Sequence, residues 1–314
     1  ANDLIFTFIS NDEDVSHPQA DDLSITLAYN GIQLLMDSGK RNGTNNEIPS
    51  GEKYHTTLMV DNKGTYNFGD RGVYTPSLNR QLTGWPGHLN VNDCSKDNYT
   101  SCYLAPEDFR GNVNIYSEKD TYNEIQGRKP YYTLNNASRH IVYYHGASPK
   151  FIVERWFAEN KSHNKNYTFT YLMNYNSSHK EGEDNISLSA KDTNLVIYTV
   201  YNSSQCSWSS NTEKYDKKLA EEHLTTNYFN LLECNDTKNI SLVNVIIPYT
   251  GKNPYTVKGF KNKTHIGAKL TSNVTEYLLL FPYNIDDNAV VTSSPVQHYV
   301  DLQPIEINFS GYME

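Results

Sequence analysis

The sequence lacks the features that mark helical, membrane-spanning or nucleic-acid-binding proteins. Only 4 of its 314 residues are methionine, and no run of 18 apolar residues occurs, so no stretch reaches the length of a membrane-spanning helix. The 27 Lys and Arg residues are outnumbered by 36 Asp and Glu, for a net charge of −9. A negative excess of this size argues against DNA or RNA as the main partner.

Several catalytic signatures are also missing. The sequence contains no Gly-x-Ser-x-Gly, no phosphate-binding loop, no Gly-x-Gly-x-x-Gly and no His-Glu-x-x-His. A hydrolase triad, a nucleotide-binding enzyme and a zinc protease therefore have no support.

Cysteine is scarce but even in number. The simplest pairing is Cys94–Cys102 and Cys206–Cys234, because each pair closes a short loop. The other two connectivities stay open, because sequence alone does not fix connectivity. No Cys-x-x-Cys or Cys/His zinc spacing is present, so the cysteines favour disulfides and an oxidising compartment.

Glycosylation signals point to the same compartment. Asn-x-Ser/Thr sequons are more frequent than chance placement predicts, although a general bias toward Asn is the alternative explanation. The chain begins at Ala1 rather than Met, which predicts a mature or excised chain of a secreted or cell-surface protein. The thirteen sequons start at Asn42, Asn98, Asn136, Asn160, Asn166, Asn176, Asn185, Asn202, Asn235, Asn239, Asn262, Asn273 and Asn308.

Strand-like segments follow one another along almost the whole chain. The 25 tyrosines and the alternation of apolar with polar residues are typical of β structure. Asn30-Gly31 between two such segments predicts a two-residue hairpin turn. One charged segment, Thr212–Leu224, is a helix candidate. The predicted strands are Leu4–Ile9, 23–27, Ile32–Met36, Thr57–Val60, Ile141–Tyr144, Phe151–Phe157, Tyr167–Met173, Leu195–Tyr201, Leu242–Ile247, Tyr277–Phe281, Ala289–Thr292 and Ile305–Phe309.

This pattern predicts an all-β fold, a large antiparallel sandwich. A weak boundary near 205–240 divides it into a main sandwich over residues 1–205 and a second part over 206–314. The second part either completes the sandwich or forms a small β-subdomain.

The stretch from His17 to Asp61 carries the most specific pattern. His17-Pro18-Gln19 is followed by a strand pair that ends in Asp37-Ser38-Gly39, and then by Tyr54-His55-Thr56-Thr57 before an apolar strand. Order, turn and strands resemble the β-sandwich domain of the heparinase II/III-like polysaccharide lyases. The later segments Ser138–Tyr144 and Phe151–Phe157 resemble the middle strands of that domain.

The resemblance implies roles for four residues. His17 matches a histidine at the catalytic cleft, which neutralises the uronate carboxylate or handles a proton. The reaction is β-elimination, in which the C5 proton is removed and the C4 oxygen leaves. Gln19, Asp37 and His55 match a metal site that braces the sandwich.

Two departures from the family weaken the enzyme interpretation. Gln19 replaces a histidine ligand, and an amide oxygen is a poor zinc ligand. The three residues therefore hold zinc, a harder divalent ion or no metal, in the last case as a hydrogen-bonded cluster around Asp37. The family's helical toroid, which supplies a catalytic Tyr and further His or Arg residues, has no counterpart in this sequence.

A basic segment near the C-terminus is a second candidate site. Lys258, Lys261 and Lys263 lie in a stretch without acids, interleaved with aromatic residues. Charge and ring stacking together suit a polyanionic glycan. The alternative is a solvated basic hairpin, since a glycan on Asn262 would stand in its middle.

Two functions follow from these observations. The first is a module of a lyase that acts on acidic polysaccharide, with a toroid supplied by another chain or by a removed segment. The second is a non-catalytic extracellular glycoprotein that uses the sandwich for glycan binding, adhesion or self-assembly.

Overall fold

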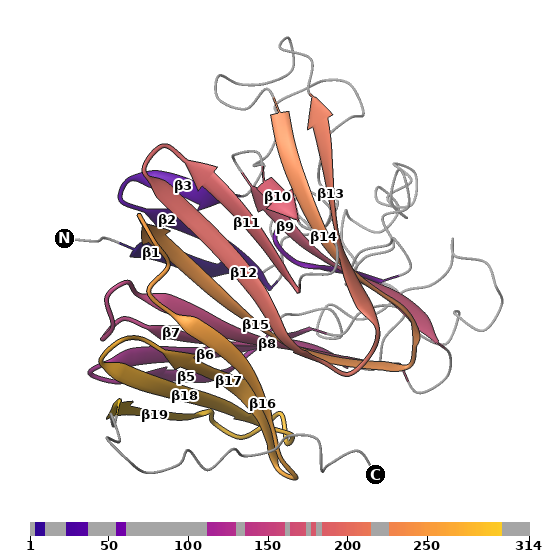
Figure 1. Ribbon diagram of the computed structural model, residues 1–314. Coiled ribbons are helices and arrows are strands. Elements are labelled where there is room, and N and C mark those ends of the chain that lie inside the picture. The colour runs from indigo at the N-terminus through magenta and orange to yellow at the C-terminus, as the bar shows by residue number, and fades with distance from the viewer. Residues whose placement is uncertain are drawn as a thin grey trace, which may run out of the picture.

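The computed structural model describes residues 4–9, 23–36, 55–60, 112–129, 136–160, 164–173, 177–179, 184–214 and 226–296. Within these ranges the chain is entirely β, every strand pairing is antiparallel, and the strands form three sheets (Figure 1). The predicted all-β antiparallel sandwich is confirmed.

The three sheets contain the strands as follows. The first sheet has the order β1-β2-β3-β9-β14-β13, with β4 also paired to β9. The central sheet has the order β10-β11-β12-β15-β8-β7-β6-β5, and the third has the order β16-β17-β18-β19. The strand bounds are β1 Leu4–Ile9, β2 Ser24–Tyr29, β3 Ile32–Leu35, β4 Leu58–Val60, β5 Asn112–Glu118, β6 Tyr122–Lys129, β7 Asn136–Tyr144, β8 Phe151–Glu159, β9 Lys165–Met173, β10 Ser177–His179, β11 Asn185–Ala190, β12 Thr193–Asn202, β13 Cys206–Lys214, β14 Thr226–Thr237, β15 Asn239–Thr250, β16 Thr256–Lys261, β17 His265–Thr271, β18 Thr275–Pro282 and β19 Val290–Pro295.

The central sheet is covered on both faces, so the molecule has two cores. Side chains alternate between the faces of a strand; in β8, Ile152 and Trp156 belong to the core shared with the first sheet, whereas Phe151 and Val153 belong to the core shared with the third. Burial on both faces explains why apolar residues occur on both faces of β8 rather than in alternation with polar ones.

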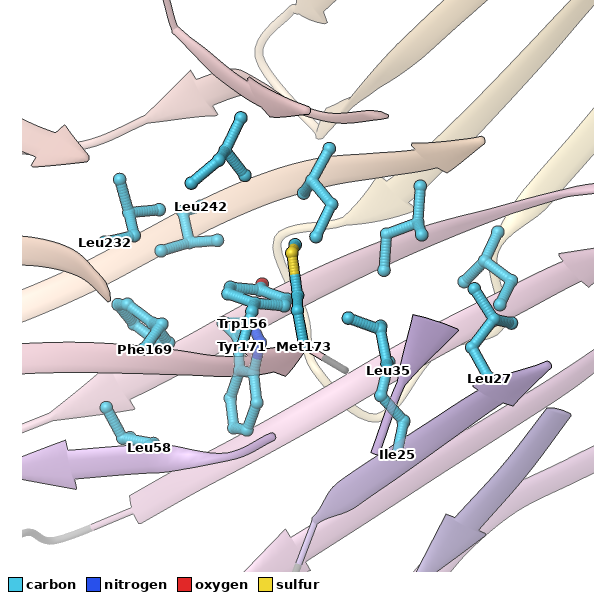
Figure 2. Close-up of a cluster of buried hydrophobic side chains, with 14 of the residues drawn as sticks. Ile25, Leu27, Leu35, Leu58, Trp156, Phe169, Tyr171, Met173, Leu232 and Leu242 are labelled. Atoms are coloured by element: carbon cyan, nitrogen blue, oxygen red, sulfur yellow. The ribbon is translucent and has the colours of Figure 1, made fainter. Parts of the chain in front are cut away.

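The core between the first and central sheets is the larger of the two. Figure 2 shows part of it, where Trp156 and Leu242 of the central sheet meet Phe169, Tyr171 and Met173 of β9. The Trp156 and Phe169 rings lie 5.4 Å apart between centroids. Burying apolar surface of this extent is the main stabilising term of the sandwich.

The core between the central and third sheets is rich in aromatic residues. Phe151 stacks on Tyr144 at 5.2 Å and meets the Tyr277 and Tyr255 rings edge-on. In Figure 1 the third sheet, coloured orange to yellow, lies below the central sheet. The aromatic contacts therefore hold two layers together.

Most of the predicted strands lie where the sequence indicated. The Asn30-Gly31 turn is confirmed: both residues have positive φ, 51° and 75°, as a type I′ hairpin between β2 and β3 requires. The strand predicted at Ile305–Phe309 lies outside the described residues.

The helix predicted at Thr212–Leu224 is wrong in its first three residues. Residues 212–214 continue β13, which pairs in register with β14 from Cys206↔Cys234 to Lys214↔Thr226. Pairing with a neighbouring strand overrides the weak helical preference of a charged segment. The remainder of that prediction lies outside the described residues.

The boundary proposed at 205/206 falls between β12 and β13. Beyond it, β13 and β14 join the first sheet, β15 joins the central sheet, and β16–β19 form the third sheet. Within the described part of the chain, no helix has the length and apolar character that a membrane crossing needs.

Candidate functional site

The site predicted from the sequence is only partly inside the described residues. His17, Gln19 and Asp37 lie outside them, whereas His55 is described and fully buried just before β4. For this site, beside His55, the structure describes only residues that adjoin the other three in sequence.

Two of these adjoining segments meet at one residue of β9. The Met36 amide donates to the Leu172 carbonyl at 3.0 Å, and the Leu172 amide donates to Thr56 Oγ1 at 3.3 Å. Asp37 follows Met36 in the chain, and His55 precedes Thr56. Asp37 and His55 are thus sequence neighbours of Met36 and Thr56, which both hydrogen-bond to the backbone of Leu172.

The buried Arg139 connects the segment that contains His55 to the segment that follows Gln19. Arg139 Nη1 donates at 2.7 Å to the carbonyl oxygens of both Leu23 and Thr56. Leu23 comes shortly after His17 and Gln19 in sequence, and Thr56 directly follows His55. One guanidinium group therefore fixes the backbone beside both candidate segments.

Arg139 is itself held by a carboxylate and an aromatic ring. Its Nε and Nη2 donate to Glu154 Oε2 at 2.8 and 2.5 Å, and both side chains are fully buried. The guanidinium lies 4.6 Å from the Trp156 ring centroid. A buried ion pair needs hydrogen bonds to its remaining polar atoms, and the Leu23 and Thr56 carbonyls supply two of them.

The other Glu154 oxygen is also satisfied. It accepts hydrogen bonds from the Tyr171 hydroxyl and, at 3.0 Å, from Asn244 Nδ2. Asn244 Oδ1 in turn accepts from Thr199 Oγ1 at 3.0 Å. Burial, and next the Glu154 charge, raise the pKa of Tyr171 well above its ordinary value. Tyr171 therefore stays protonated, and its hydroxyl donates to Glu154.

A second polar cluster lies on the opposite face of the central sheet. His140 Nε2 and Glu124 Oε1 are 2.7 Å apart and both side chains are buried. Glu124 also accepts from the Ala289 amide at 2.6 Å and from Asn288 Nδ2 at 2.9 Å. Gln126 Nε2 donates to the Ile285 carbonyl at 2.7 Å. The cluster therefore fastens the segment before β19 to the central sheet.

The electrostatics of this cluster favour a neutral histidine. Burial lowers the pKa of His140 despite the neighbouring carboxylate. Burial opposes ionisation of Glu124, but the bonds from His140, Asn288 and Ala289 outweigh it and lower its pKa. Charged residues inside an apolar strand pattern are the sequence signal that could have revealed both clusters.

The structure splits the predicted basic site between two faces of β16. Lys261 lies with its Nζ 5.6 Å from the Tyr201 ring centroid, whereas Lys258 is three residues earlier and projects from the other face. Lys258 pairs across the sheet with Lys269, which forms an ion pair with Glu276 at 2.8 Å. Lys263 is exposed in the β16–β17 turn. The three lysines do not form one patch.

The described cysteines pair as predicted. Cys206 and Cys234 form a disulfide between directly opposed residues of β13 and β14, with Cα atoms 4.2 Å apart. Cys94 and Cys102 lie outside the described residues.

The sequons differ in exposure. Asn160 is buried, at 7% exposure, and Asn136 lies in β7. Asn185 and Asn202 are half-buried. The sequon residues Asn42, Asn98, Asn176 and Asn308 lie outside the described residues. Exposed asparagines, which a hydrophilic glycan requires, are Asn166, Asn235, Asn239, Asn262 and Asn273.

The candidate ligand set does not suit zinc. It offers one imidazole from His55, one carboxylate from Asp37 and one amide oxygen from Gln19, whereas zinc sites in proteins use imidazole, thiolate and carboxylate. Among the described residues no group of three or more His, Cys, Asp or Glu side chains could hold a metal ion.

Comparison with known families decides the relationship. Residues 9–252 match the family described as Heparinase II/III-like, C-terminal. The chain belongs to this family. The match covers β2 to β15, which are the first sheet without β1 and the whole central sheet. It includes Arg139 and His140 and ends just after β15.

Solved structures of the heparinase II/III-like group share the fold. The heparan sulfate lyase HepC from Pedobacter heparinus superimposes with a TM-score of 0.64 at 14% identity, over 90% of this chain and 39% of that one. A heparinase III gene product gives 0.60 at 12% identity, over 93% and 39%, and a further heparinase III gives 0.58 at 12%, over 93% and 40%. A search of curated proteins finds no match. The chain thus spans about two fifths of the length of these enzymes.

Proposed function

We propose that this chain is the β-sandwich module of a secreted polysaccharide lyase that acts on uronate-containing, acidic polysaccharide by β-elimination. One observation carries the proposal: the described neighbours of the candidate residues are fixed to a common support. Leu172 accepts from the Met36 amide beside Asp37 and donates to Thr56 Oγ1 beside His55. Arg139 donates to the Thr56 carbonyl and to the Leu23 carbonyl, which follows Gln19 in sequence.

The proposed chemistry assigns His17 to the reaction and the other three residues to support. β-Elimination removes the C5 proton of a uronate and expels the C4 oxygen, and it requires a group that neutralises the carboxylate. His17 supplies that group or moves a proton. Gln19, Asp37 and His55 brace the segment that carries it, and the Arg139–Glu154 pair keeps the brace rigid.

A non-catalytic glycan-binding protein is the second candidate. Gln19 in place of a histidine ligand favours it, because an amide oxygen is a poor zinc ligand. In that case the same acidic polysaccharide is bound without being cleaved.

Product formation separates the two candidates. The full natural-length protein is incubated with heparan sulfate, hyaluronan and alginate, and the absorbance of the unsaturated uronate product is followed. A lyase yields product from at least one of them. Binding without product from any of the three supports the non-catalytic candidate, and neither binding nor product contradicts both.

His17 variants test the assigned role. His17→Ala is expected to abolish product formation with the thermal unfolding midpoint unchanged, because the proposal places this side chain in the reaction and not in the core. His265→Ala in β17, on a sheet that the proposed reaction does not use, is the matched control and keeps its activity. Equal activity of His17→Ala and wild type would contradict the catalytic role.

Secretion and glycosylation are part of the same proposal. The Cys206–Cys234 disulfide and the exposed sequons support an oxidising, glycosylating compartment. Peptide mass spectrometry of protein from its native source is expected to find glycans on exposed sites such as Asn166 and Asn273. An intact mass equal to the bare polypeptide would contradict glycosylation.

A further inference from the structure

A close backbone approach places Lys261 beside the central sheet. A Cβ on Gly259 of β16 would lie 2.0 Å from the Val200 carbonyl oxygen of β12, so only glycine permits this approach. Lys261, two residues later, projects from the same face of β16. This crossing brings its ammonium group over the ring of Tyr201, the residue after Val200, at 5.6 Å.

Tyr283 completes an aromatic pair at this crossing. Its amide donates to the Thr264 carbonyl at 2.8 Å, which ties it to the β16–β17 turn, and its side chain is 37% exposed. Burial and the Tyr201 hydroxyl raise the pKa of Tyr283, while the positive charges of Lys261 and Arg155 act in the opposite direction. Arg155 donates to the carbonyl oxygen of Pro282, the residue before Tyr283, so the chain beside Tyr283 is tied to Arg155 as well as to the β16–β17 turn.

Within the described residues, the two cations of this cluster have no direct ion-pair partner. Arg155 is buried, at 3% exposure, and donates to the Pro282 carbonyl and, at 3.4 Å, to Ser241 Oγ. Burial lowers its pKa to about 10. Within the described residues neither Arg155 nor Lys261 forms an ion pair with a carboxylate. By contrast, Lys269 and Arg128 have acidic partners, Glu276 and Asp286.

We propose that Lys261, Tyr201 and Tyr283 form a surface site for an acidic sugar unit, with Arg155 adding positive charge beneath it. A carboxylate or sulfate group binds the Lys261 ammonium, and the tyrosine rings contact the apolar face of the pyranose. The ligand class, acidic polysaccharide, rests on the proposed function; the site itself does not. It lies on the third-sheet side of the central sheet, opposite the Arg139 support, and holds the polysaccharide away from the reaction.

The test is site-resolved lysine labelling. The protein is made in a host without N-glycosylation, because Asn262 begins a sequon beside Lys261, and it carries His17→Ala so that the probe is not cleaved. Lysines are acetylated with and without a heparan sulfate hexasaccharide and quantified by peptide mass spectrometry. Lys258, on the opposite face of the same strand, is the internal control.

At a hexasaccharide concentration of about four times its dissociation constant, contact with the anionic sugar is expected to slow Lys261 acetylation about fivefold and that of Lys258 less than about twofold. Inorganic sulfate at the same anion concentration and neutral cellohexaose are expected to protect neither residue. Equal protection of both lysines, or none of Lys261, would overturn the proposal. Protection of Lys261 by sulfate alone would show a simple anion site and overturn the sugar assignment.

Variants check the contributions to affinity. Lys261→Gln and Tyr283→Ala are each expected to weaken hexasaccharide binding about fivefold, and Lys258→Gln less than about twofold. An effect of Lys258→Gln as large as that of Lys261→Gln would contradict the site. Lyase activity is measured separately on protein with His17 intact, so a failure of this site and a failure of the proposed reaction give different results.

Discussion

The two faces of the central sheet bury charge in different ways. Adjacent residues of β7 point to opposite faces: Arg139 lies in the core shared with the first sheet and His140 in the core shared with the third. The same holds in β8 for Glu154 and Arg155. On the first-sheet side Arg139 and Glu154 neutralise each other; on the third-sheet side Arg155 has no carboxylate partner among the described residues.

The two arginines therefore differ in what they can contact: Arg139 bonds within the protein, whereas the charge of Arg155 is open to a ligand's influence. The Arg139–Glu154 pair uses its hydrogen bonds within the protein, four of them on the guanidinium, so it holds segments in place and offers nothing to a ligand. Arg155 leaves a local positive charge on a chain whose net charge is −9. Such a charge can serve an anion that comes from outside.

The largest expected effect is at Arg139. Arg139→Met should lower the free energy of unfolding by about 3–5 kcal/mol, because it leaves Glu154 buried without its cation. The Leu23 and Thr56 carbonyls also lose their shared donor. Urea denaturation measures the change; a loss below about 1 kcal/mol would show that the pair is not needed, and the contrast between the faces would fail.

The second-largest expected effect is the loss of the Cys206–Cys234 disulfide, which stabilises the first sheet. Replacing Cys206 and Cys234 together by serine should cost about 2–4 kcal/mol, because the cross-link closes a 28-residue separation and restricts the unfolded chain. Denaturation of the reduced wild-type protein is the matched control and should give the same loss. An unchanged midpoint in both would contradict the prediction.

A pH series sharpens the comparison on the third-sheet side. The pKa of His140 is lowered in the folded protein, so unfolding releases a histidine that takes up a proton below its ordinary pKa of 6.5. Its contribution to stability is therefore complete above pH 6.5 and decreases as the pH falls. The carboxyl of Glu124, whose pKa is also lowered, loses its contribution in the same direction, below its ordinary 4.5.

His140→Gln isolates the histidine's part. Glutamine donates a hydrogen bond to Glu124 but does not titrate, so the variant should lose less stability than wild type between about pH 8 and pH 5. Equal slopes of unfolding free energy against pH in the two proteins would show that His140 does not contribute.

The smallest effect is expected at Arg128. It pairs with Asp286 at 2.5 Å, but the Asp286 side chain is 67% exposed, and exposed pairs contribute little. Arg128→Met should change the unfolding free energy by less than about 1 kcal/mol. A loss comparable to that of Arg139→Met would erase the distinction between buried and exposed pairs.

The sequence predicted the apolar strands well and the polar ones poorly. β1 and the β2–β3 hairpin follow from alternation and from Asn30-Gly31. β6 was missed because its inward residues include Glu124 and Gln126, which are buried only because His140 and the segment before β19 satisfy them. Pairing between distant residues is not visible in a local pattern.

The candidate site shows the same limit. The order of His17, Asp37 and His55 indicated the family, which the comparison confirms. Arg139, by contrast, was predicted only as a residue of the segment Ser138–Tyr144. Its role depends on Leu23 and Thr56, both far from it in sequence, reaching one nitrogen atom. Similarly, Lys258 and Lys261 do not form one patch, because residues three positions apart in a β-strand face opposite sides.

The position of the central sheet also governs how the molecule opens. Because β8 and β15 are hydrogen-bonded to strands on both sides and covered by a layer on each face, their amides reach solvent only when both outer layers detach. Hydrogen exchange at Val153 and Val245 is expected to proceed by global unfolding, whereas the edge strands β1 and β19 exchange by local fraying. Exchange of these amides by global unfolding would show that the two outer layers open together with the central sheet.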